Sequence, residues 1–399
     1  MKMDLAKHAL AVFGLTLSLL SIGLPVSAQE EVTAAEASSA EEFAPAALTG
    51  DFASAIVIDA QTGQVLLATN ADERRQPASM LKMMTELVIL DMVDEGGLKM
   101  DDVVKVSAHA SRMGGSQVYL KHGEEFTLEE LLMALTIHSA NDAAVALAEH
   151  AAGSVEAFVD LMNMKAATLG MEDTVFHSVH GLPPGYGQEP DLTTARDMAT
   201  LGRALVRHPQ ALGWASVKNA PFRDGKFILT NPNKLVGKYR GLDGIKTGFT
   251  APAGFCVTAS AVQKGKRLIS VVMGCHTDDD RATETTRLLT YGFNAYKEVT
   301  VVPAAGTPTE AMVGIKGGKV SEAALNFGSE LKVMIPRNLE ERIVVETEVP
   351  ENVDAPLPAG AEVGEAVVKL GDVELGRVPL VLAETVEKGN WWHRLLNKK

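Results

Sequence analysis

The decisive stretch of this sequence reads Pro77-Ala78-Ser79-Met80-Leu81-Lys82-Met83-Met84-Thr85. The apolar run from Met80 to Val93 predicts a helix that begins at Ala78 or Ser79. Because three residues make nearly one turn of a helix, the Ser79 hydroxyl and the Lys82 amine should share one face and touch. The rest of the chain is interpreted from this pair outward.

A serine and lysine pair of this kind can form an acylation centre. Serine is a poor nucleophile at neutral pH and needs a base within hydrogen-bond reach, which a lysine supplies only if its pKa is lowered. Burial and a second cation both lower the pKa of an amine. Taken alone, however, S-x-x-K is better explained as an N-cap serine followed by a solvated lysine, since the pattern is common.

The N-terminus has the pattern of a secretory signal peptide over residues 1–28. Lys2 and Lys7 are basic, an apolar stretch follows from Ala9 to Leu24, and Val26-Ser27-Ala28 is a small-residue cleavage site. The apolar stretch is too short for a confident membrane span, and no later run reaches about 18 apolar residues. We therefore expect an exported protein of the periplasm, with residues 29–49, rich in Ala, Glu and Ser, as a flexible leader.

Composition excludes several classes of function. The formal net charge is −14, which argues against nucleic acid or another large polyanion as a partner. The chain has two cysteines, too few for a disulfide scaffold or a four-cysteine metal site. The sequence contains no H-E-x-x-H motif, and we interpret His138 and His180 as structural. We therefore expect neither a metal ion nor a cofactor.

The two cysteines, Cys256 and Cys275, lie in a predicted hairpin whose turn is Lys264-Gly265. In that register Cys256 faces Met273 and lies diagonally from Cys275, at about 7–8 Å, which is long for a disulfide. We expect two free thiols.

The order of elements predicts an α+β domain over residues 50–298. A hairpin is followed by helices, then by short strands, and a last helix near 281–298 closes the domain. This order implies an antiparallel sheet in which the first and last strands meet, with helices on its faces. The expected elements are strands at 55–59, 65–68, 254–262 and 267–273, and helices at 80–93, 127–137, 141–150, up to 169, and 194–207.

Short alternating runs separated by Gly, Pro and Asn predict an all-β domain over residues 299–384. Residues 385–399 form a tail in which Trp391, Trp392, Leu395 and Leu396 share one face of a helix and basic residues lie elsewhere. That composition favours binding to an anionic membrane surface. The alternative is a tail that packs its tryptophans on the β domain.

Two later motifs change the interpretation of the first. Ser139-Ala140-Asn141 lies at a junction between helices, and Lys246-Thr247-Gly248 lies in a strand. S-x-x-K, S-D-N and K-T-G in this order are the signature of penicillin-binding proteins and class A β-lactamases. Three elements in order and in the expected contexts are very unlikely to coincide by chance.

With these three motifs the chain resembles the low-molecular-mass penicillin-binding proteins that are D-alanyl-D-alanine carboxypeptidases. The resemblance covers most of residues 50–298 and implies a β-lactamase/transpeptidase-like fold. It includes Leu169-Gly170-Met171, Thr194-Ala195-Arg196-Asp197-Met198-Ala199 and Arg267-Leu268-Ile269-Ser270-Val271-Val272-Met273-Gly274. The family also carries a β-rich C-terminal domain and often an amphipathic tail.

The resemblance implies catalytic roles for five residues. Ser79 would attack the carbonyl between two terminal D-alanines of a peptidoglycan stem, and a neutral Lys82 would take its proton. Ser139 would relay a proton to the leaving amine, and Asn141 would hold Lys82 and the substrate amide. Lys246 would supply positive potential. β-Lactam antibiotics would acylate Ser79 as inhibitors.

Further residues would bind the substrate. The strand after Lys246 can pair with an extended peptide, with Gly248 leaving room, and the backbone N–H groups of Ser79 and Phe249 would form the oxyanion hole. Thr247, Thr250 and Arg281 would recognise the terminal carboxylate, although Arg281 could also be a surface residue of the helix.

The chain departs from the family at two positions. Ala140 stands where Gly is frequent, and Phe249 stands where His is frequent; either change could alter the rate or the pH profile.

Three alternatives remain open. A β-lactamase needs a glutamate for deacylation, and Glu189-Pro190-Asp191-Leu192-Thr193 comes close to the E-x-x-L-N pattern, but Thr replaces Asn. A D,D-endopeptidase would share every catalytic residue. A non-catalytic wall-binding scaffold is disfavoured by the intact motifs.

Overall fold

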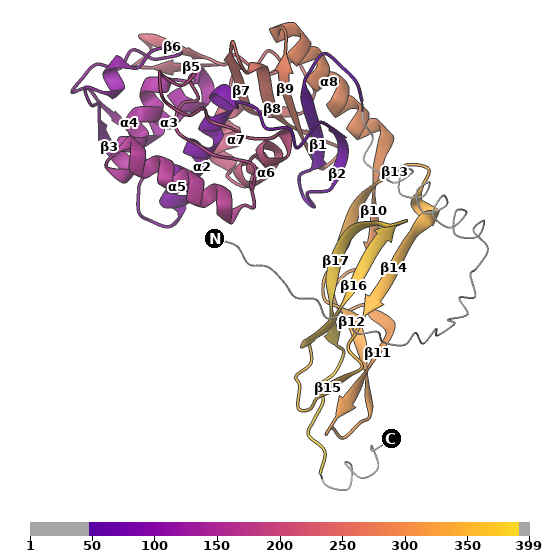
Figure 1. Ribbon diagram of the computed structural model, residues 1–399. Coiled ribbons are helices and arrows are strands. Elements are labelled where there is room, and N and C mark those ends of the chain that lie inside the picture. The colour runs from indigo at the N-terminus through magenta and orange to yellow at the C-terminus, as the bar shows by residue number, and fades with distance from the viewer. Residues whose placement is uncertain (1–47, 391–399) are drawn as a thin grey trace, which may run out of the picture. The chain divides into compact units, whose positions relative to one another are not determined.

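The computed structural model describes residues 48–390, which include a five-stranded antiparallel sheet (Figure 1). The strand order is β2-β1-β9-β8-β7. The pairing of β1 with β9 confirms that the first and last strands of this part meet. β7 has no strand on its outer side among the described residues, so one edge of the sheet is free. The strands are β1 (Ser54–Asp59), β2 (Val65–Thr69), β7 (Leu242–Thr250), β8 (Gly254–Gln263) and β9 (Lys266–Cys275).

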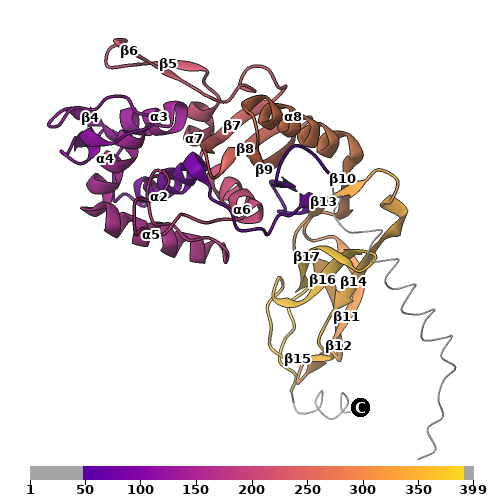
Figure 2. The same ribbon diagram turned by 45° about the horizontal axis from the view of Figure 1, so that its top comes forward.

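Helices cover both faces of this sheet, as Figures 1 and 2 show. In β1, Ile56 and Ile58 belong to the core beneath α2 and α6, while Ala55 and Val57 belong to the core beneath α8. Successive side chains of a strand point to opposite faces, so a strand buried on both faces is apolar at almost every position. The helices are α2 (Lys82–Asp94), α3 (Leu128–His138), α4 (Asn141–Ala152), α5 (Val155–Thr168), α6 (Ala195–Leu205), α7 (Pro209–Ala215) and α8 (Asp278–Ala295).

Most helices lie where the sequence predicts them, and the capping box at Thr127 is confirmed. The prediction for the last helix is wrong at both ends. A second capping box at Thr277 starts α8 at Asp278, and the β-branched residues after Ala295 join a strand instead. The sequence analysis also missed the 3₁₀ turn η2 (Ala110–Arg112), the short helix α7 and two short pairs of antiparallel strands. The pairs are β3 (Val103–Lys105) with β4 (Glu125–Thr127), and β5 (Asn219–Phe222) with β6 (Phe227–Thr230).

The Lys264-Gly265 turn is confirmed, and the predicted register holds from Val257 to the turn. At Cys256 the register shifts by one residue, so its predicted pairing with Met273 is wrong. The bulge contributes to placing Cys256 in one hydrophobic core and Cys275 in the other, on opposite faces of the sheet. Both thiols are buried and free, as expected.

The C-terminal part is all β, apart from the 3₁₀ turn η3 (Glu340–Arg342). β10 pairs with β13, and the six-stranded sheet has the order β14-β16-β17-β12-β11-β15. Because β10 begins at Tyr296 and isolated bridges reach Lys388, we propose limits of 296–388 for this domain, wider than the predicted 299–384. The strands are β10 (Tyr296–Val302), β11 (Pro308–Lys316), β12 (Glu322–Phe327), β13 (Leu331–Pro336), β14 (Ile343–Glu348), β15 (Asn352–Asp354), β16 (Glu362–Leu370) and β17 (Val373–Leu382).

The predicted signal peptide, most of the leader and the tail tryptophans Trp391 and Trp392 lie outside the described residues. Within residues 48–390, the helices are too short or too polar to cross a membrane.

The capping box of α3 gives the first prediction. The Thr127 hydroxyl accepts a hydrogen bond from the Glu130 N–H at 3.2 Å, and the Glu130 carboxylate accepts one from the Thr127 N–H at 2.8 Å. Thr127→Ala should lower the free energy of unfolding by about 1 kcal/mol in denaturant titrations. Thr127→Ser keeps the hydroxyl and should lie close to wild type; equal losses in both variants would contradict the capping role.

Candidate active site

The predicted nucleophile lies in the 3₁₀ turn η1 (Ala78–Leu81), which leads directly into α2. Ala78 has a φ of +48°, an unfavourable conformation for a residue with a Cβ. Two glycines make room for this turn. A Cβ added to Gly181 would lie 2.1 Å from the Ala78 carbonyl oxygen, and one added to Gly248 would lie 2.8 Å from that of Pro77. Gly248 therefore lets the serine turn approach the sheet. The sequence analysis instead expected the missing side chain of Gly248 to leave room for a substrate peptide.

The structure brings Ser79 and Lys82 together. The Lys82 Nζ lies 3.0 Å from the Ser79 Oγ and donates a hydrogen bond to the His180 carbonyl oxygen at 2.6 Å. The Lys82 side chain is fully buried. Burial, reinforced by the charge on Lys246, holds the pKa of Lys82 well below its ordinary value. A neutral amine beside the alcohol is the form that can accept its proton.

Ser139 lies between α3 and α4, and Asn141 is the first residue of α4. Ser139 caps α3 with a φ of +64°, and its buried hydroxyl has no hydrogen-bond partner within the described part of the chain. The Asn141 amide donates to the Gly114 carbonyl oxygen at 2.7 Å, and no hydrogen bond to Lys82 is present among residues 48–390. Ala140 is extended (φ −64°, ψ 121°), so the position does not require Gly.

Lys246 lies on β7 and is buried. Burial, with a further contribution from the charge on Arg281, lowers its pKa to about 7, against the opposing effect of Glu86. The sequence analysis missed Glu86, a fully buried carboxyl one turn after Lys82 on α2. Its signal was an acidic residue in the mostly apolar stretch from Met83 to Leu90.

The environment of Glu86 keeps a proton on it. Neither carboxyl oxygen has a hydrogen-bond partner among the described residues. Burial raises the pKa of Glu86 from 4.5 to about 8, and the nearby Thr136 hydroxyl and the charge on Lys246 only partly oppose this. The Thr136 hydroxyl likewise has no hydrogen-bond partner among the described residues.

A cavity of about 450 Å³ opens beside these groups. Its lining includes Ser79, Ser139, Thr247, Phe249 and Arg281. Phe249 is half exposed and stacks on Phe255 with 4.1 Å between ring centroids, so an aromatic pair forms this wall of the cavity.

Thr250 does not join the other predicted carboxylate-binding residues in the cavity lining. It is three residues after Thr247 on β7, and alternation along a strand directs the two side chains to opposite faces. Its hydroxyl accepts a hydrogen bond from the Ala253 N–H at 3.3 Å in the following turn.

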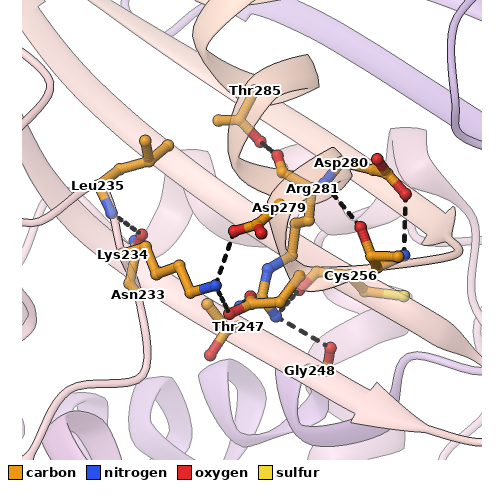
Figure 3. A network of polar contacts seen from close by, with 12 residues as sticks. Asn233, Lys234, Leu235, Thr247, Gly248, Cys256, Asp279, Asp280, Arg281 and Thr285 are labelled. Carbon is orange, nitrogen blue, oxygen red and sulfur yellow. Dashed lines mark hydrogen bonds and ion pairs between the residues drawn. The ribbon is translucent and has the colours of Figure 1, made fainter.

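Arg281 is buried in this wall and is not a surface residue of α8. Its guanidinium donates to the carbonyl oxygens of Gly248 at 3.4 Å and Cys256 at 3.2 Å (Figure 3). It therefore ties α8 to β7 and β8 beside the cavity.

The histidines have structural contacts. The Nδ1 of His138 accepts from the Thr230 N–H, and the Nδ1 of His180 accepts from the Leu182 N–H. Burial, and then the charge on Lys82, lowers the pKa of His180 to about 4, which keeps that ring neutral. Among residues 48–390, no group of three or more His, Cys, Asp or Glu side chains is arranged to hold a metal ion.

Comparison with known proteins gives the family. Residues 41–277 match the D-alanyl-D-alanine carboxypeptidase family, and residues 296–388 match the C-terminal domain of penicillin-binding protein 5. This chain belongs to the D-alanyl-D-alanine carboxypeptidase family.

Relatives match over most of this family member's length. It is 36% identical to D-alanyl-D-alanine carboxypeptidase DacF of Bacillus subtilis over 85% of this chain and 86% of that protein. The crystal structure of penicillin-binding protein 5 from Haemophilus influenzae is similar, with a TM-score of 0.76 at 30% identity, covering 86% of this chain and 99% of the other. Penicillin-binding protein D2 from Listeria monocytogenes in its ampicillin-bound form gives a TM-score of 0.57 at 32% identity, over 62% of this chain and 99% of the other.

The contact between Gly181 and the serine turn gives the second prediction. Gly181→Ala adds a methyl group where only 2.1 Å separates it from the Ala78 carbonyl oxygen, so the turn must move. We expect a loss of more than about 2 kcal/mol in the free energy of unfolding, and slower acylation of Ser79 by a fluorescent penicillin.

Gly170→Ala is the matched control, because Gly170 also has a positive φ, +72°, but nothing lies within 4 Å of the added atom. It should lose about 1 kcal/mol and acylate normally. Equal acylation rates in the two variants would contradict the proposed clamping of the turn.

The raised pKa of Glu86 gives the third prediction. The folded state binds one more proton than the unfolded state between the two pKa values, 4.5 and about 8, so stability should fall as pH rises through this window. The slope from this group approaches about 1.4 kcal/mol per pH unit. Glu86→Gln removes the titrating group, so its stability relative to wild type should rise from about pH 5 to 8 in urea titrations.

Glu95→Gln changes an exposed glutamate at the end of the same helix and serves as control. Its stability curve should run parallel to that of wild type. If the Glu86→Gln curve also ran parallel to that of wild type, Glu86 would have the same pKa in the folded and unfolded states, and the prediction would be wrong.

Proposed function

We propose that this family member is a serine-type D-Ala-D-Ala carboxypeptidase that removes the terminal D-alanine from peptidoglycan pentapeptide stems through a Ser79 acyl-enzyme. The observation that carries the proposal is the 3.0 Å contact between the Nζ of the fully buried Lys82 and the Ser79 Oγ. Family membership and the order of the three motifs support the same activity.

In the first half of the reaction, the Ser79 Oγ attacks the carbonyl carbon of the penultimate D-alanine while Lys82 takes the hydroxyl proton. The negative charge on the carbonyl oxygen would be stabilised by the backbone N–H groups of Ser79 and Phe249. Collapse of this intermediate breaks the C–N bond, and the proton taken up by Lys82 passes through Ser139 to the leaving amine, which returns Lys82 to its neutral form. Ser139 is suited to this role because its hydroxyl is not engaged by another described group.

In the second half, water attacks the Ser79 ester, Lys82 accepts a proton from that water, and the alcohol re-forms as the shortened peptide leaves. Lys246 contributes positive potential beside the reacting oxygen. We assign Asn141 to the substrate amide, since its Oδ1 has no partner within residues 48–390. The free edge of β7 supports pairing with an extended stem peptide.

Recognition of the terminal carboxylate is assigned to Thr247 and Arg281, both in the cavity lining. Thr250 is left out of this role because it does not line that cavity.

The same site would be acylated by β-lactams, an expectation supported by the ampicillin-bound relative. A β-lactamase activity is disfavoured, because Glu189, the candidate for deacylation, is exposed and does not line the cavity. The D,D-endopeptidase alternative uses the same catalytic residues, so these residues do not distinguish it from the carboxypeptidase. A non-catalytic wall-binding scaffold would not need a buried lysine beside the serine, a costly arrangement.

Export to the periplasm is proposed from the signal-like residues 1–28, and contact with the outer face of the anionic cytoplasmic membrane is proposed from Trp391, Trp392, Leu395 and Leu396.

The fourth prediction tests the activity itself. Purified protein should release D-alanine from a synthetic stem pentapeptide and should bind a fluorescent penicillin covalently. Ser79→Ala should abolish both, because it removes the attacking oxygen. Ser216→Ala, which changes an exposed serine that donates to the Gly213 carbonyl oxygen, should retain both. D-Alanine release by Ser79→Ala would exclude the proposed mechanism.

A further inference from the structure

The guanidinium proposed to bind the substrate carboxylate already has a carboxylate partner within the chain. Arg281 forms an ion pair with Asp278, one turn earlier on α8. Both residues line the cavity that contains Ser79. Arg281 uses one nitrogen for the carbonyl oxygens of Gly248 and Cys256, as Figure 3 shows, and another for Asp278. A substrate carboxylate that reaches Arg281 must therefore share it with Asp278.

Asp278 is held in this place from its other side. The Lys234 Nζ lies 2.8 Å from the Asp278 Oδ2, while the Oδ1 faces Arg281. The Lys234 Nζ also lies 2.8 Å from the Asp279 Oδ1, an ion pair visible in Figure 3. The Asp279 side chain is 85% exposed, whereas that of Asp278 is 28% exposed. The two neighbouring aspartates thus share one lysine, but only Asp278 pairs with Arg281.

The charge of Asp278 matters because of where the guanidinium lies. Arg281 is buried, and its guanidinium carbon lies 5.7 Å from the centre of the Phe255 ring. Charges interact more strongly in such a setting than in water. Asp278 neutralises part of the attraction that Arg281 exerts on an anion, and it repels a second carboxylate directly. A substrate whose peptide continues as a neutral amide at the same position meets no such repulsion.

We propose that Asp278 sets the selectivity of the site between stems that end in a free carboxylate and stems whose chain continues as an amide, by weakening the preference for the free acid. The inference rests on the proposed function and deepens it, since it names the side chain that sets how strongly the site prefers a free terminal carboxylate. Lys234 moderates the effect, because it neutralises part of the Asp278 charge.

The test compares two synthetic pentapeptides, one ending in D-Ala-D-Ala and the other in the corresponding C-terminal carboxamide. Release of D-alanine or D-alaninamide gives kcat/KM for each peptide, and the ratio of acid to amide measures the selectivity. Asp278→Asn should raise this ratio by about tenfold, mainly through a lower KM for the acid, because it removes a like charge from the binding site.

Asp279→Asn is the matched control, with the same change of charge in the same turn and the same loss of a Lys234 partner. Its ratio should stay within about twofold of wild type, because Asp279 does not pair with Arg281. Lys234→Met should move the ratio in the opposite direction, since it leaves the charge of Asp278 less compensated. This third variant tests the inference even if Asp278→Asn folds poorly.

An active Asp278→Asn enzyme with an unchanged or lower ratio would overturn the inference alone, since Asp278 would then only orient Arg281. An unchanged or higher ratio in Lys234→Met would also count against it. Wild-type protein that releases neither product would overturn the proposed function, and this inference with it.

Discussion

The structure depends on one costly arrangement, a lysine amine buried beside a serine hydroxyl. Lys82 is fully buried, and the contacts of its Nζ are the Ser79 Oγ and a carbonyl oxygen, neither of which carries a compensating charge. Burial disfavours the charged ammonium, so the pKa of Lys82 is held well below its ordinary value. The same desolvation that makes this position costly for stability therefore supports the proposed role of Lys82 as a base.

The surrounding elements hold this pair in place. The serine turn has a non-glycine residue, Ala78, with positive φ, and Ser139 on the facing loop has positive φ as well. Such conformations persist only where the surrounding structure imposes them. Here Gly181 and Gly248 allow backbone to approach the turn from two sides. This tight backbone contact fixes the position of the turn that carries Ser79.

The sheet connects this centre to the site for the substrate terminus. β7 carries Lys246 and Thr247 at a free edge, and Arg281 reaches from α8 to the backbone of both β7 and β8. Arg281 thus places positive charge in the cavity wall, while Lys246 is buried on the strand behind it. The charge of Arg281 is shared with Asp278, so the proposed binding of an anion depends on an acidic residue as well as a basic one.

The sequence by itself determined much of this protein. The three motifs predicted the candidate catalytic residues, and the order of the elements predicted that the first and last strands of the sheet meet, because local periodicity and spacing are readable along the chain. The sequence analysis missed the ends of the last helix, the bulge at Cys256 and the short strand pairs. At such places several nearby residues can cap a helix or pair with a strand, and the sequence does not show which of them does. Only the tertiary structure decided that Glu86 is buried near Lys246, that Thr250 does not line the cavity and that Asp278 pairs with Arg281. These facts depend on which side chains of different helices and strands come into contact. Such contacts, and not neighbours in sequence, set burial and charge pairing.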